Sequence, residues 1–347
     1  MLTLAVYSLD LPAYACAWLR LLGPAAALKG RVDIRWAARS DGASYAISAE
    51  AMQGADAVVF QRYFPMRETW PLVERALASG LPVIYETDDN FLAVPEDHPM
   101  RQRLEPVVPF AAELLARADC VTVSTPEHKR ALAGRARRVE VLPNLVDERL
   151  WGQTARQEGE APGGAGSGGP VRIVFAGTPS RSGDLAFLAP VLAGIRERFG
   201  RGVAFTFLGC ALPGLDAREI TFQEDYAGYA RALAALRPDI GLAPLADSPF
   251  NRCKSAVKWL EYSALGAAGV YADLPPYAWV RHGETGLKAG PDPGLWYDAL
   301  KRLIRDTTLR DRLGRQARAE VMSRWSLRAG AEGYLRLWRN IIGGGHG

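Results

Sequence analysis

The chain has 347 residues, of which 48% are hydrophobic and 23% charged, as is ordinary for a soluble globular protein long enough to form two domains. The formal net charge of +4 is too small to indicate nucleic-acid binding by itself, although it fits a protein that handles phosphorylated ligands or contacts an anionic membrane surface. The four cysteines are widely scattered and form no Cys-x-x-Cys pair, so we expect reduced thiols and no zinc site.

The first half alternates short β-branched runs with amphipathic segments. We predict strands at 2–7, 32–36, 57–61, 82–86, 120–123 and 139–142, and helices at 11–28, 69–79 and 106–117. Arg20 and Pro24 interrupt the apolar stretch 11–28, which argues against a signal peptide or a membrane span. Strands that alternate with helices in this way indicate βαβ units and a parallel sheet.

A break in composition follows. We predict a flexible linker or loop at residues 151–170, because the run 159–170 consists of Gly, Ala, Pro, Ser and Glu and cannot bury a core. The alternation then restarts, with strands predicted at 171–176, 203–208, 219–222, 240–243 and 269–272, and helices at 185–199, 226–236, 258–265, 295–321 and 327–341. We therefore predict two Rossmann-like domains, 1–150 and 171–325, followed by a terminal helix and a Gly-rich tail at 326–347, with a ligand cleft between the domains.

Residues 251–262, Asn-Arg-Cys-Lys-Ser-Ala-Val-Lys-Trp-Leu-Glu-Tyr, carry the most informative pattern. On a continuous helix, Lys254, Lys258 and Glu261 would share one face because they are spaced i, i+4 and i+7. Asn251 or Ser255 can cap such a helix and leave its N-terminal N–H groups beside the two lysines. This arrangement predicts an anion site suited to a diphosphate, whereas the alternative is a solvated basic face.

Several segments, taken in order, resemble GT-B glycosyltransferases, especially the family 4-like enzymes of bacterial surface polysaccharide and glycoprotein synthesis. Residues 141–147 resemble the interdomain Pro-Asn-Gly-x-Asp segment, with Leu145 in place of the glycine, and 174–178 resemble the first strand and glycine turn of the donor domain. Residues 273–287 are similar to the closing Gly-x-Thr-Gly segment of the family, and 251–262 to its donor-binding segment. The resemblance implies two facing Rossmann-like domains and a nucleotide-sugar donor.

By this resemblance, the donor-binding residues are Gly177, Thr178, Arg181, Asn251, Lys254, Ser255, Lys258 and Glu261. Glu261 matches the second glutamate of the Glu-x7-Glu pattern, which holds the ribose, but Cys253 stands where the first glutamate would be. Lys254 would bind the diphosphate, and Lys258 would pair either with a phosphate or with Glu261. The missing glutamate weakens a retaining assignment.

The amino half offers Asp88 and Asp89, directly after a predicted strand, as candidates for the general base that deprotonates an acceptor hydroxyl. The alternative is a turn stabilised by Asp and Asn side chains. Arg62, Tyr63 and His98 are candidates for the acceptor side, although a lone loop histidine is more often solvated.

The sequence thus predicts transfer of a hexose-type sugar from a nucleoside-diphosphate sugar to a glycan, a lipid-linked glycan or a protein. We expect no metal and no cofactor, because lysines can stabilise the leaving diphosphate. The expected location is the cytoplasm, with peripheral contact at the inner membrane face left open. A non-catalytic GT-B module that binds a nucleotide-sugar or glycan is the alternative; a nucleotide-sugar 2-epimerase is less favoured, because no adequate acid/base set is found.

Overall fold

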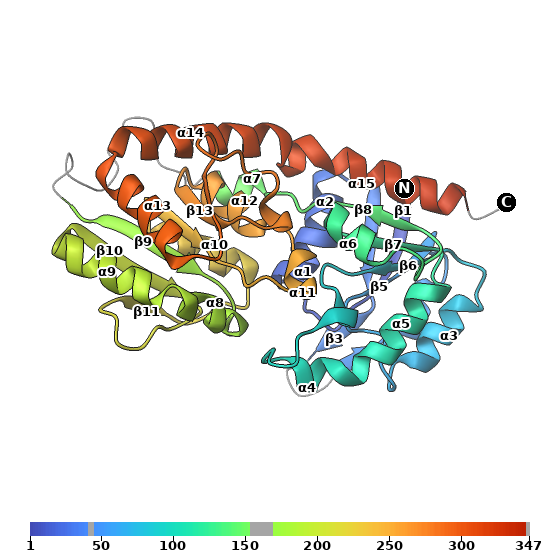
Figure 1. Ribbon diagram of the computed structural model, residues 1–347. Coiled ribbons are helices and arrows are strands. Elements are labelled where there is room, and N and C mark those ends of the chain that lie inside the picture. Colours follow the sequence, from blue (N-terminus) through green and yellow to red (C-terminus); the bar gives the residue numbers. More distant parts are fainter. Residues whose placement is uncertain (41–44, 153–168, 345–347) are drawn as a thin grey trace. The chain divides into compact units, whose positions relative to one another are not determined.

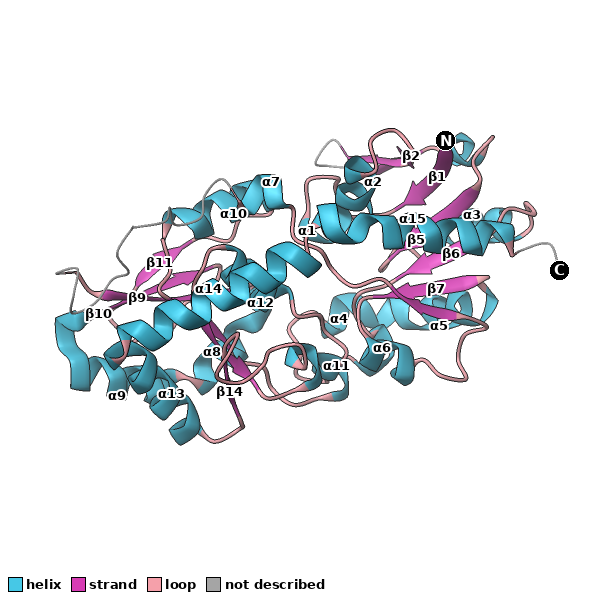
Figure 2. Ribbon diagram, turned by 90° about the horizontal axis from the view of Figure 1, so that it is seen from above, coloured by secondary structure: helices cyan, strands magenta, loops and turns pink. Residues whose placement is uncertain are grey.

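A computed structural model describes residues 1–40, 45–152 and 169–344 of the chain. The chain divides into two compact units, each built on a six-stranded parallel sheet (Figures 1 and 2). The first unit consists of Met1–Leu145, Ser248–Ser255 and Leu327–Gly347, and the second of Val146–Asp247 and Ala256–Ser326. The chain therefore first passes from one unit to the other after residue 145, before the segment predicted as a linker. Residues 153–168 of that segment lie outside the described part of the chain.

The first sheet has the order β2-β1-β5-β6-β7-β8. Its strands are β1 (Leu2–Tyr7), β2 (Val32–Trp36), β5 (Ala57–Gln61), β6 (Val83–Glu86), β7 (Cys120–Val123) and β8 (Val139–Val141). A separate antiparallel pair, β3 (Ala38–Ser40) and β4 (Tyr45–Ile47), was not expected from the sequence. The six sheet strands match the predicted ones to within one residue, because apolar β-branched runs between turn residues mark buried parallel strands.

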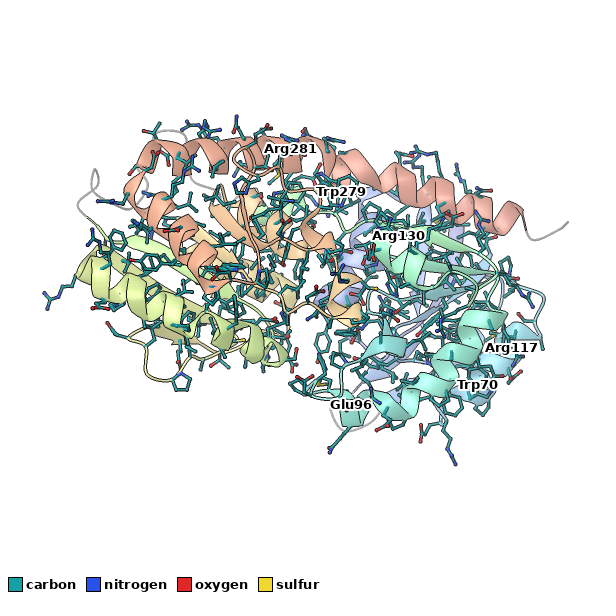
Figure 3. The ribbon with its side chains drawn as sticks, in the orientation of Figure 1. Trp70, Glu96, Arg117, Arg130, Trp279 and Arg281 are labelled. Carbon is teal, nitrogen blue, oxygen red and sulfur yellow. The ribbon has the colours of Figure 1, made fainter. Side chains whose placement is uncertain are left out.

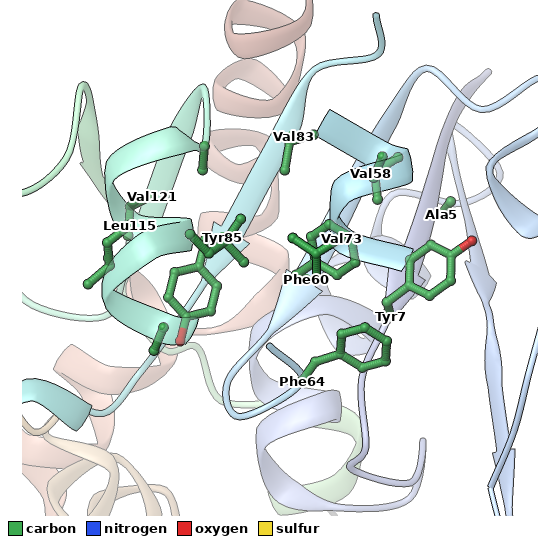
Figure 4. Close-up of a cluster of buried hydrophobic side chains, with 14 of the residues drawn as sticks. Ala5, Tyr7, Val58, Phe60, Phe64, Val73, Val83, Tyr85, Leu115 and Val121 are labelled. Carbon is green, nitrogen blue, oxygen red and sulfur yellow. The ribbon is translucent and has the colours of Figure 1, made fainter. Parts of the chain in front are cut away.

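Both faces of the first sheet are covered by helices. One face packs against α3 (Trp70–Leu77) and α5 (Val108–Arg117) through a core that contains Tyr7, Phe60 and Tyr85 (Figure 4). The other face packs against α2 (Gly23–Ala27) and α15 (Leu327–Gly343). The remaining helical turns of this unit are α1 (Ala15–Ala17), η1 (Trp18–Leu22), η2 (Ala49–Met52), η3 (Phe91–Ala93), α4 (Arg101–Leu104), η4 (Glu105–Val107), α6 (Pro126–Ala131) and α11 (Pro249–Arg252).

The second sheet has the order β11-β10-β9-β12-β13-β14. Its strands are β9 (Val171–Ala176), β10 (Val203–Leu208), β11 (Arg218–Ile220), β12 (Ile240–Ala243), β13 (Ala268–Ala272) and β14 (Leu287–Ala289). Its helices are α7 (Glu148–Trp151), α8 (Ser182–Phe187), α9 (Ala189–Phe199), α10 (Tyr226–Ala235), α12 (Val257–Ala264), α13 (Pro293–Arg305) and α14 (Thr307–Arg324), with short turns η5 (Pro179–Arg181), η6 (Gly200–Gly202) and η7 (Pro275–Tyr277). Helix α9 packs beside α13, and α12 packs beside α14.

Aspartates placed just before strands hold the register of both sheets. The carboxylate of Asp56 accepts the backbone N–H of Thr3 at 2.7 Å, and Asp119 accepts that of Val83 at 2.7 Å. Asp239 does the same for the N–H of Arg172 at 2.8 Å. In each case a carboxylate accepts the N–H of the first or second residue of a neighbouring strand, which helps to fix where pairing begins.

Two long helical predictions require correction. The segment 295–321 is not one helix: Asp306 ends α13 and caps α14, where its side chain accepts the N–H of Leu309 at 2.8 Å. The segment 11–28 contains a π-helical turn, Trp18–Leu22. Within the described residues, no helix combines the length and apolar character needed to span a bilayer.

Candidate functional site

In each sheet the strand order reverses beside the first strand of the unit. In the first unit the chain passes from β1 to β2 on one side and then to β5 on the other; in the second unit β9 is flanked in the same way by β10 and β12. Parallel α/β sheets bind ligands at such reversals, beyond the carboxyl ends of the strands. The residues that follow β1, β5 and β6, and those that follow β9 and β12, therefore occupy the two expected ligand-binding edges.

The edge in the first unit carries three carboxylates around one guanidinium. Arg62, which follows β5, lies 2.7 Å from Asp88 and 3.2 Å from Asp89, both of which follow β6. It also lies 3.4 Å from Asp10, which follows β1. Arg62, predicted as an acceptor-side residue, is thus the partner of both predicted catalytic carboxylates.

The backbone of Arg62 is held in an unusual conformation. Its φ of +54° is in the left-handed region, which costs a residue with a side chain on the order of 1 kcal/mol or more. Two hydrogen bonds of 2.8 Å compensate: the N–H of Arg62 donates to the carbonyl of Glu86, and its own carbonyl accepts from the hydroxyl of Tyr85. Strand β6 therefore sets the direction in which Arg62 leaves β5.

Asp89 has a second cationic partner. The Nζ of Lys254 lies 2.9 Å from Asp89 Oδ1. Although burial opposes ionisation, Lys254 and Arg62 together hold the pKa of Asp89 well below its usual range. A carboxylate held in this way is a weak proton acceptor.

Asp88 has a different environment. Its Oδ1 accepts from Arg62, and its Oδ2 accepts from the thiol of Cys16 at 3.3 Å. Burial raises the pKa of Cys16, so the thiol remains a neutral donor rather than a thiolate. Asp88 is thus paired with one cation, whereas Asp89 is paired with two.

Lys254 reaches Asp89 because the segment 248–255 packs on the first unit. Phe250 is buried in a small cluster with Phe91, Val94 and Leu104. The carbonyl of Cys253 accepts from the hydroxyl of Thr125 at 2.9 Å. Cys253, which stands where the first glutamate of the family pattern would be, is therefore a buried packing residue.

Tyr63 and His98 lie beside this edge. The hydroxyl of Tyr63 donates to Asp10, so Tyr63 helps to orient a carboxylate. His98 is half-buried: its Nδ1 accepts the N–H of Met100 at 3.2 Å, and its ring packs edge-on against Phe250 at 5.1 Å. Glu96, in the same loop, is exposed (Figure 3).

A buried ion pair is formed by Glu86, two residues before Asp88. Arg20, in the π-helical turn, lies 2.7 Å from Glu86 at the end of β6. Arg20 also donates to Asn144 Oδ1 at 2.9 Å, and Asn144 donates to the hydroxyl of Ser255 at 2.9 Å. Arg20 therefore joins the end of β6 to the predicted Pro-Asn segment, and Asn144 joins that segment to residues 248–255.

His128, on α6, is fully buried on the core side of this edge. It borders a cavity of about 10 Å³, the lower limit for one water molecule, together with Thr87, Asp89 and Asn90. Neither of its ring nitrogens has a hydrogen-bond partner among the described residues. Burial lowers the pKa of His128 to about 4, against the opposing effect of Asp89 and Asp88.

The edge in the second unit begins with a close approach of two turns. The carbonyl of Gly177 lies so near Gly209 that a Cβ at Gly209 would come within 2.0 Å of it, and Gly209 has a φ of +84°. Gly177 is buried and Thr178 is exposed. Arg181 follows; its Nε lies 3.1 Å from Asp184, and its guanidinium donates to the carbonyl of Pro244 at 3.0 Å. The guanidinium of Arg181 is thus tied to the loop that follows β12.

Helix α12 places Lys258 and Glu261 together. Lys258 Nζ lies 2.7 Å from Glu261 Oε2 and 2.7 Å from the hydroxyl of Tyr229 on α10. The Tyr229 hydroxyl in turn donates to Glu261 Oε2 at 2.7 Å. Of the two partners proposed for Lys258, the structure shows Glu261.

The expectation of one continuous helix over 251–262 is wrong. Helix α11 ends at Arg252, α12 begins at Val257, and Lys254 lies in the break between them. Neither Asn251 nor Ser255 caps α12, whose N-cap position is Ala256. Asn251 instead lies in α11, which is capped by Ser248. Lys254 therefore does not share a helix face with Lys258 and Glu261.

The segment 273–287 has a packing function at its exposed end. Trp279 packs edge-on against Trp325 at 4.9 Å, and Arg281 forms ion pairs with Glu284 at 2.7 Å and Glu320 at 2.6 Å (Figure 3). These contacts attach the loop to α14. Leu145, which replaces the glycine of the family's interdomain segment, is buried against Gly330, where a Cβ would lie 2.6 Å from a Leu145 methyl group.

The sequence reasoning missed Asp10 and Tyr229. Asp10 follows the first predicted strand and was therefore available as a candidate, but its proximity to Asp88 depends on the strand order β1-β5-β6. Tyr229 lies in the predicted helix 226–236, where a pattern of apolar residues gave no reason to single it out. Among the described residues, no grouping of three or more His, Cys, Asp or Glu side chains suits a metal ion.

Solved structures with the same fold span nearly the whole chain. Sucrose-phosphate synthase from Thermosynechococcus elongatus matches with a TM-score of 0.71 and 15% identity, covering 99% of this chain and 100% of that one. HepE from Anabaena, in complex with UDP and glucose, matches with a TM-score of 0.67 and 16% identity over 98% and 100%. A glycosyltransferase from Rickettsia africae ESF-5 matches with a TM-score of 0.64 and 11% identity over 98% of both chains.

No family model matches the sequence, and no curated protein matches it. At these identities the structural matches show the fold alone. The two parallel six-stranded sheets and their agreement with solved glycosyltransferases confirm the predicted α/β GT-B fold.

Proposed function

We propose that this protein transfers a sugar from a nucleoside-diphosphate sugar to an acceptor hydroxyl. The observation that carries the proposal is the match of both units to glycosyltransferases over 98–99% of the chain, including a HepE structure in complex with UDP-glucose. The two edges supply the groups that such a transfer needs: cations and backbone N–H groups for a diphosphate, a carboxylate for a ribose, and a carboxylate for proton removal.

The proposed donor contacts divide between backbone and side chains. The N–H of Gly177 donates to the carbonyl of Leu208 at 3.0 Å, so the backbone contact proposed for a phosphate at this glycine turn is the N–H of Thr178. Arg181 offers a guanidinium already oriented by Asp184. Lys254 is the lysine proposed for the diphosphate, because Lys258 is engaged by Glu261. If a bound diphosphate took the place of Asp89 as the partner of Lys254, Lys254 would be paired with an anion both before and after the donor binds.

Asp88 is the proposed general base. Asp89 is paired with two cations that lower its pKa, whereas Asp88 is paired with one cation and a neutral thiol. A carboxylate held by two cations is a weak proton acceptor, so the carboxylate with fewer cationic partners suits the task better. A carboxylate base of this kind suits inversion of configuration.

The carboxylates also indicate the acceptor class. Asp10 and Asp88 are hydrogen-bond acceptors at one edge, and Tyr63 is beside them, a set that suits a polyhydroxylated acceptor such as a glycan, free, lipid-linked or on a protein. We propose that the reaction uses no metal and no cofactor. The proposed location is the cytoplasm, with contact at the inner membrane face supported by the net charge of +4.

A ligand screen followed by a turnover assay tests the proposal. UDP, GDP, ADP, CDP and their sugar conjugates are added to the purified protein, and one of them is expected to raise the midpoint of thermal unfolding because it binds only the folded state. The best donor is then incubated with and without EDTA, and release of nucleoside diphosphate is measured. Binding without donor cleavage in the presence of a broad acceptor mixture would favour a non-catalytic module, and loss of turnover in EDTA would contradict metal independence.

A further inference from the structure

Three side chains of the second unit form a closed set of hydrogen bonds. Lys258 donates to both Tyr229 and Glu261, and Tyr229 donates to Glu261, each at 2.7 Å. Both donors reach the same carboxylate oxygen, Oε2. The other oxygen, Oε1, has no hydrogen bond to any residue in the described part of the chain.

The ring of Tyr229 has little freedom to move. It stacks on Tyr226 at 6.2 Å with an interplanar angle of 15°, and Trp151 packs edge-on against it at 6.2 Å. The ammonium of Lys258 lies 4.8 Å from the centre of the Tyr229 ring. Burial and the neighbouring Glu261 raise the pKa of Tyr229, so its hydroxyl keeps the proton that it donates.

The two hydrogen bonds to Oε2 leave Oε1 of the buried Glu261 carboxylate available to accept a hydrogen bond from a ligand. Glu261 is only 2% exposed, so an ionised side chain there requires charge-assisted partners, and both come to Oε2. Without the Tyr229 hydroxyl, Lys258 alone would hold the carboxylate, whose plane could then turn away from the orientation that directs the second oxygen outward, because the terminal torsion is broad.

We propose that Tyr229 is a positioning residue that fixes the carboxylate of Glu261 so that Oε1 accepts the ribose hydroxyls of the nucleotide donor. The proposal rests on the donor-binding function proposed above and assigns a specificity role to a residue that does not itself touch the nucleotide. Ribose recognition, rather than phosphate affinity, is the property that depends on Tyr229.

The test compares nucleotides that differ only at the ribose. Binding of UDP, ADP and GDP is measured by calorimetry beside their 2′-deoxy and 3′-deoxy counterparts, and the base that binds the wild-type protein best is carried forward. The wild-type protein is expected to prefer the ribonucleotide by about tenfold or more over at least one deoxy form, because the deoxy ligand leaves a buried charged acceptor unpaired. Tyr229→Phe is expected to reduce this preference to about threefold or less, mainly by weakening ribonucleotide binding.

Tyr226→Phe is the matched control. It removes a buried hydroxyl from the neighbouring ring of the same stack, but that hydroxyl accepts from Trp151 Nε1 at 3.2 Å and has no hydrogen bond to Glu261. This variant is expected to keep the wild-type preference. The preference is a ratio of two affinities for the same folded population, so partial unfolding of a variant does not change it.

Each outcome decides between the proposals. Undiminished preference in folded Tyr229→Phe, or an equal loss in Tyr226→Phe, would overturn the positioning role. If Tyr229→Phe does not fold, Glu261→Gln is tested in its place. With Tyr229 and Lys258 both donating to the amide oxygen, the NH₂ group is directed to the ribose, so the preference for the ribonucleotide should fall. An unchanged preference would refute the fixed orientation. Failure of the wild-type protein to bind any nucleotide would instead refute the proposed function.

Discussion

Asp88 and Asp89 are neighbours in the chain but have different partners, and this difference determines which of them is suited to accept a proton. Asp89 shares Arg62 with Asp88 and is also paired with Lys254, whereas the second contact of Asp88 is the thiol of Cys16. If a bound nucleotide-sugar broke the ion pair between Lys254 and Asp89, the environment of Asp89 would change far more than that of Asp88. The two residues therefore make different contributions that single substitutions can separate.

Asp88→Asn is expected to lower kcat by about 10²-fold or more with little change in donor KM, because it removes the proposed proton acceptor and leaves the proposed donor contacts intact. Asp89→Asn is expected to keep kcat within about tenfold and to change donor KM, because it removes the partner of Lys254. Steady-state kinetics with the best donor measures both. Full kcat in Asp88→Asn, or a larger loss in Asp89→Asn, would contradict the assignment.

The buried His128 makes stability depend on pH. Its pKa is lowered from an ordinary value of 6.5 to about 4 in the folded protein, so the unfolded chain takes up a proton first as the pH falls. The free energy of unfolding should therefore decrease as the pH falls from 6.5 toward 4 and be unaffected by this group above 6.5. At pH 5 the loss attributable to His128 is about 2 kcal/mol.

Urea unfolding of the wild-type protein and of His128→Leu at pH 7, 6 and 5 measures this effect. The variant should lose less stability across the series, and the difference between the two proteins isolates His128 from the carboxylates that titrate in both. His282→Leu, at an exposed position, is the control. Parallel losses in the wild-type protein and His128→Leu would show that His128 is not responsible.

Strands were far easier to predict than the break between α11 and α12. Each sheet strand except β14 was anticipated, because a short apolar run bounded by turn residues carries its own signal. The helical spacing of Lys254, Lys258 and Glu261 was misleading: Phe250 and Cys253 are buried in the first unit, and this tertiary packing interrupts the helix. Asp10 was missed for a related reason, because strand order brings distant loops together and is not encoded in local spacing.

Loss of an aspartate that precedes a strand is expected to lower the free energy of unfolding, because it weakens the pairing of two strands. Asp239→Ala is expected to lower the free energy of unfolding by about 2–4 kcal/mol, because the N–H of Arg172 loses its buried acceptor and the Arg172 side chain loses contacts at 2.9 and 3.1 Å. Asp33→Ala is the control: its ion pair with Arg35 is 42% exposed on each side, so a change within about 0.5 kcal/mol is expected. Denaturant unfolding measures both, and equal effects would refute the special position of Asp239.

At the scale of the molecule, the chain passes between its two units four times, after residues 145, 247, 255 and 326. The first unit is therefore completed by segments from far along the sequence. Helix α15 is the larger of these, and it buries Tyr334, Leu335, Trp338 and Ile341 against the face of the first sheet. The domain prediction from sequence placed this helix after the second domain without assigning its packing, because an amphipathic pattern does not name the surface that it covers.

A chain that ends at Ser326 should therefore lose the cooperative unfolding of the first unit. Full burial of each large apolar side chain contributes about 1.5–3 kcal/mol, so loss of the helix removes an amount comparable to the stability of a typical domain. Near-UV circular dichroism and binding of a hydrophobic dye report the exposed face. Addition of a synthetic peptide covering 327–343 should reverse the change; a native-like signal from the shortened chain alone would contradict the argument.

The return of α15 also has a consequence for biosynthesis. The strands of the first sheet are translated early, but one face of that sheet is covered only in part, by α2, until the ribosome has made everything from residue 146 to residue 326. At about 5–20 residues per second, this delay is on the order of ten seconds or more, during which the nascent sheet exposes apolar surface that favours aggregation. All residues of the second unit lie between 146 and 326, where only the segment 248–255 belongs to the first unit. The second unit can therefore fold before α15 packs on the first sheet. The order of folding on the ribosome is thus expected to be the reverse of the order in which the two sheets begin.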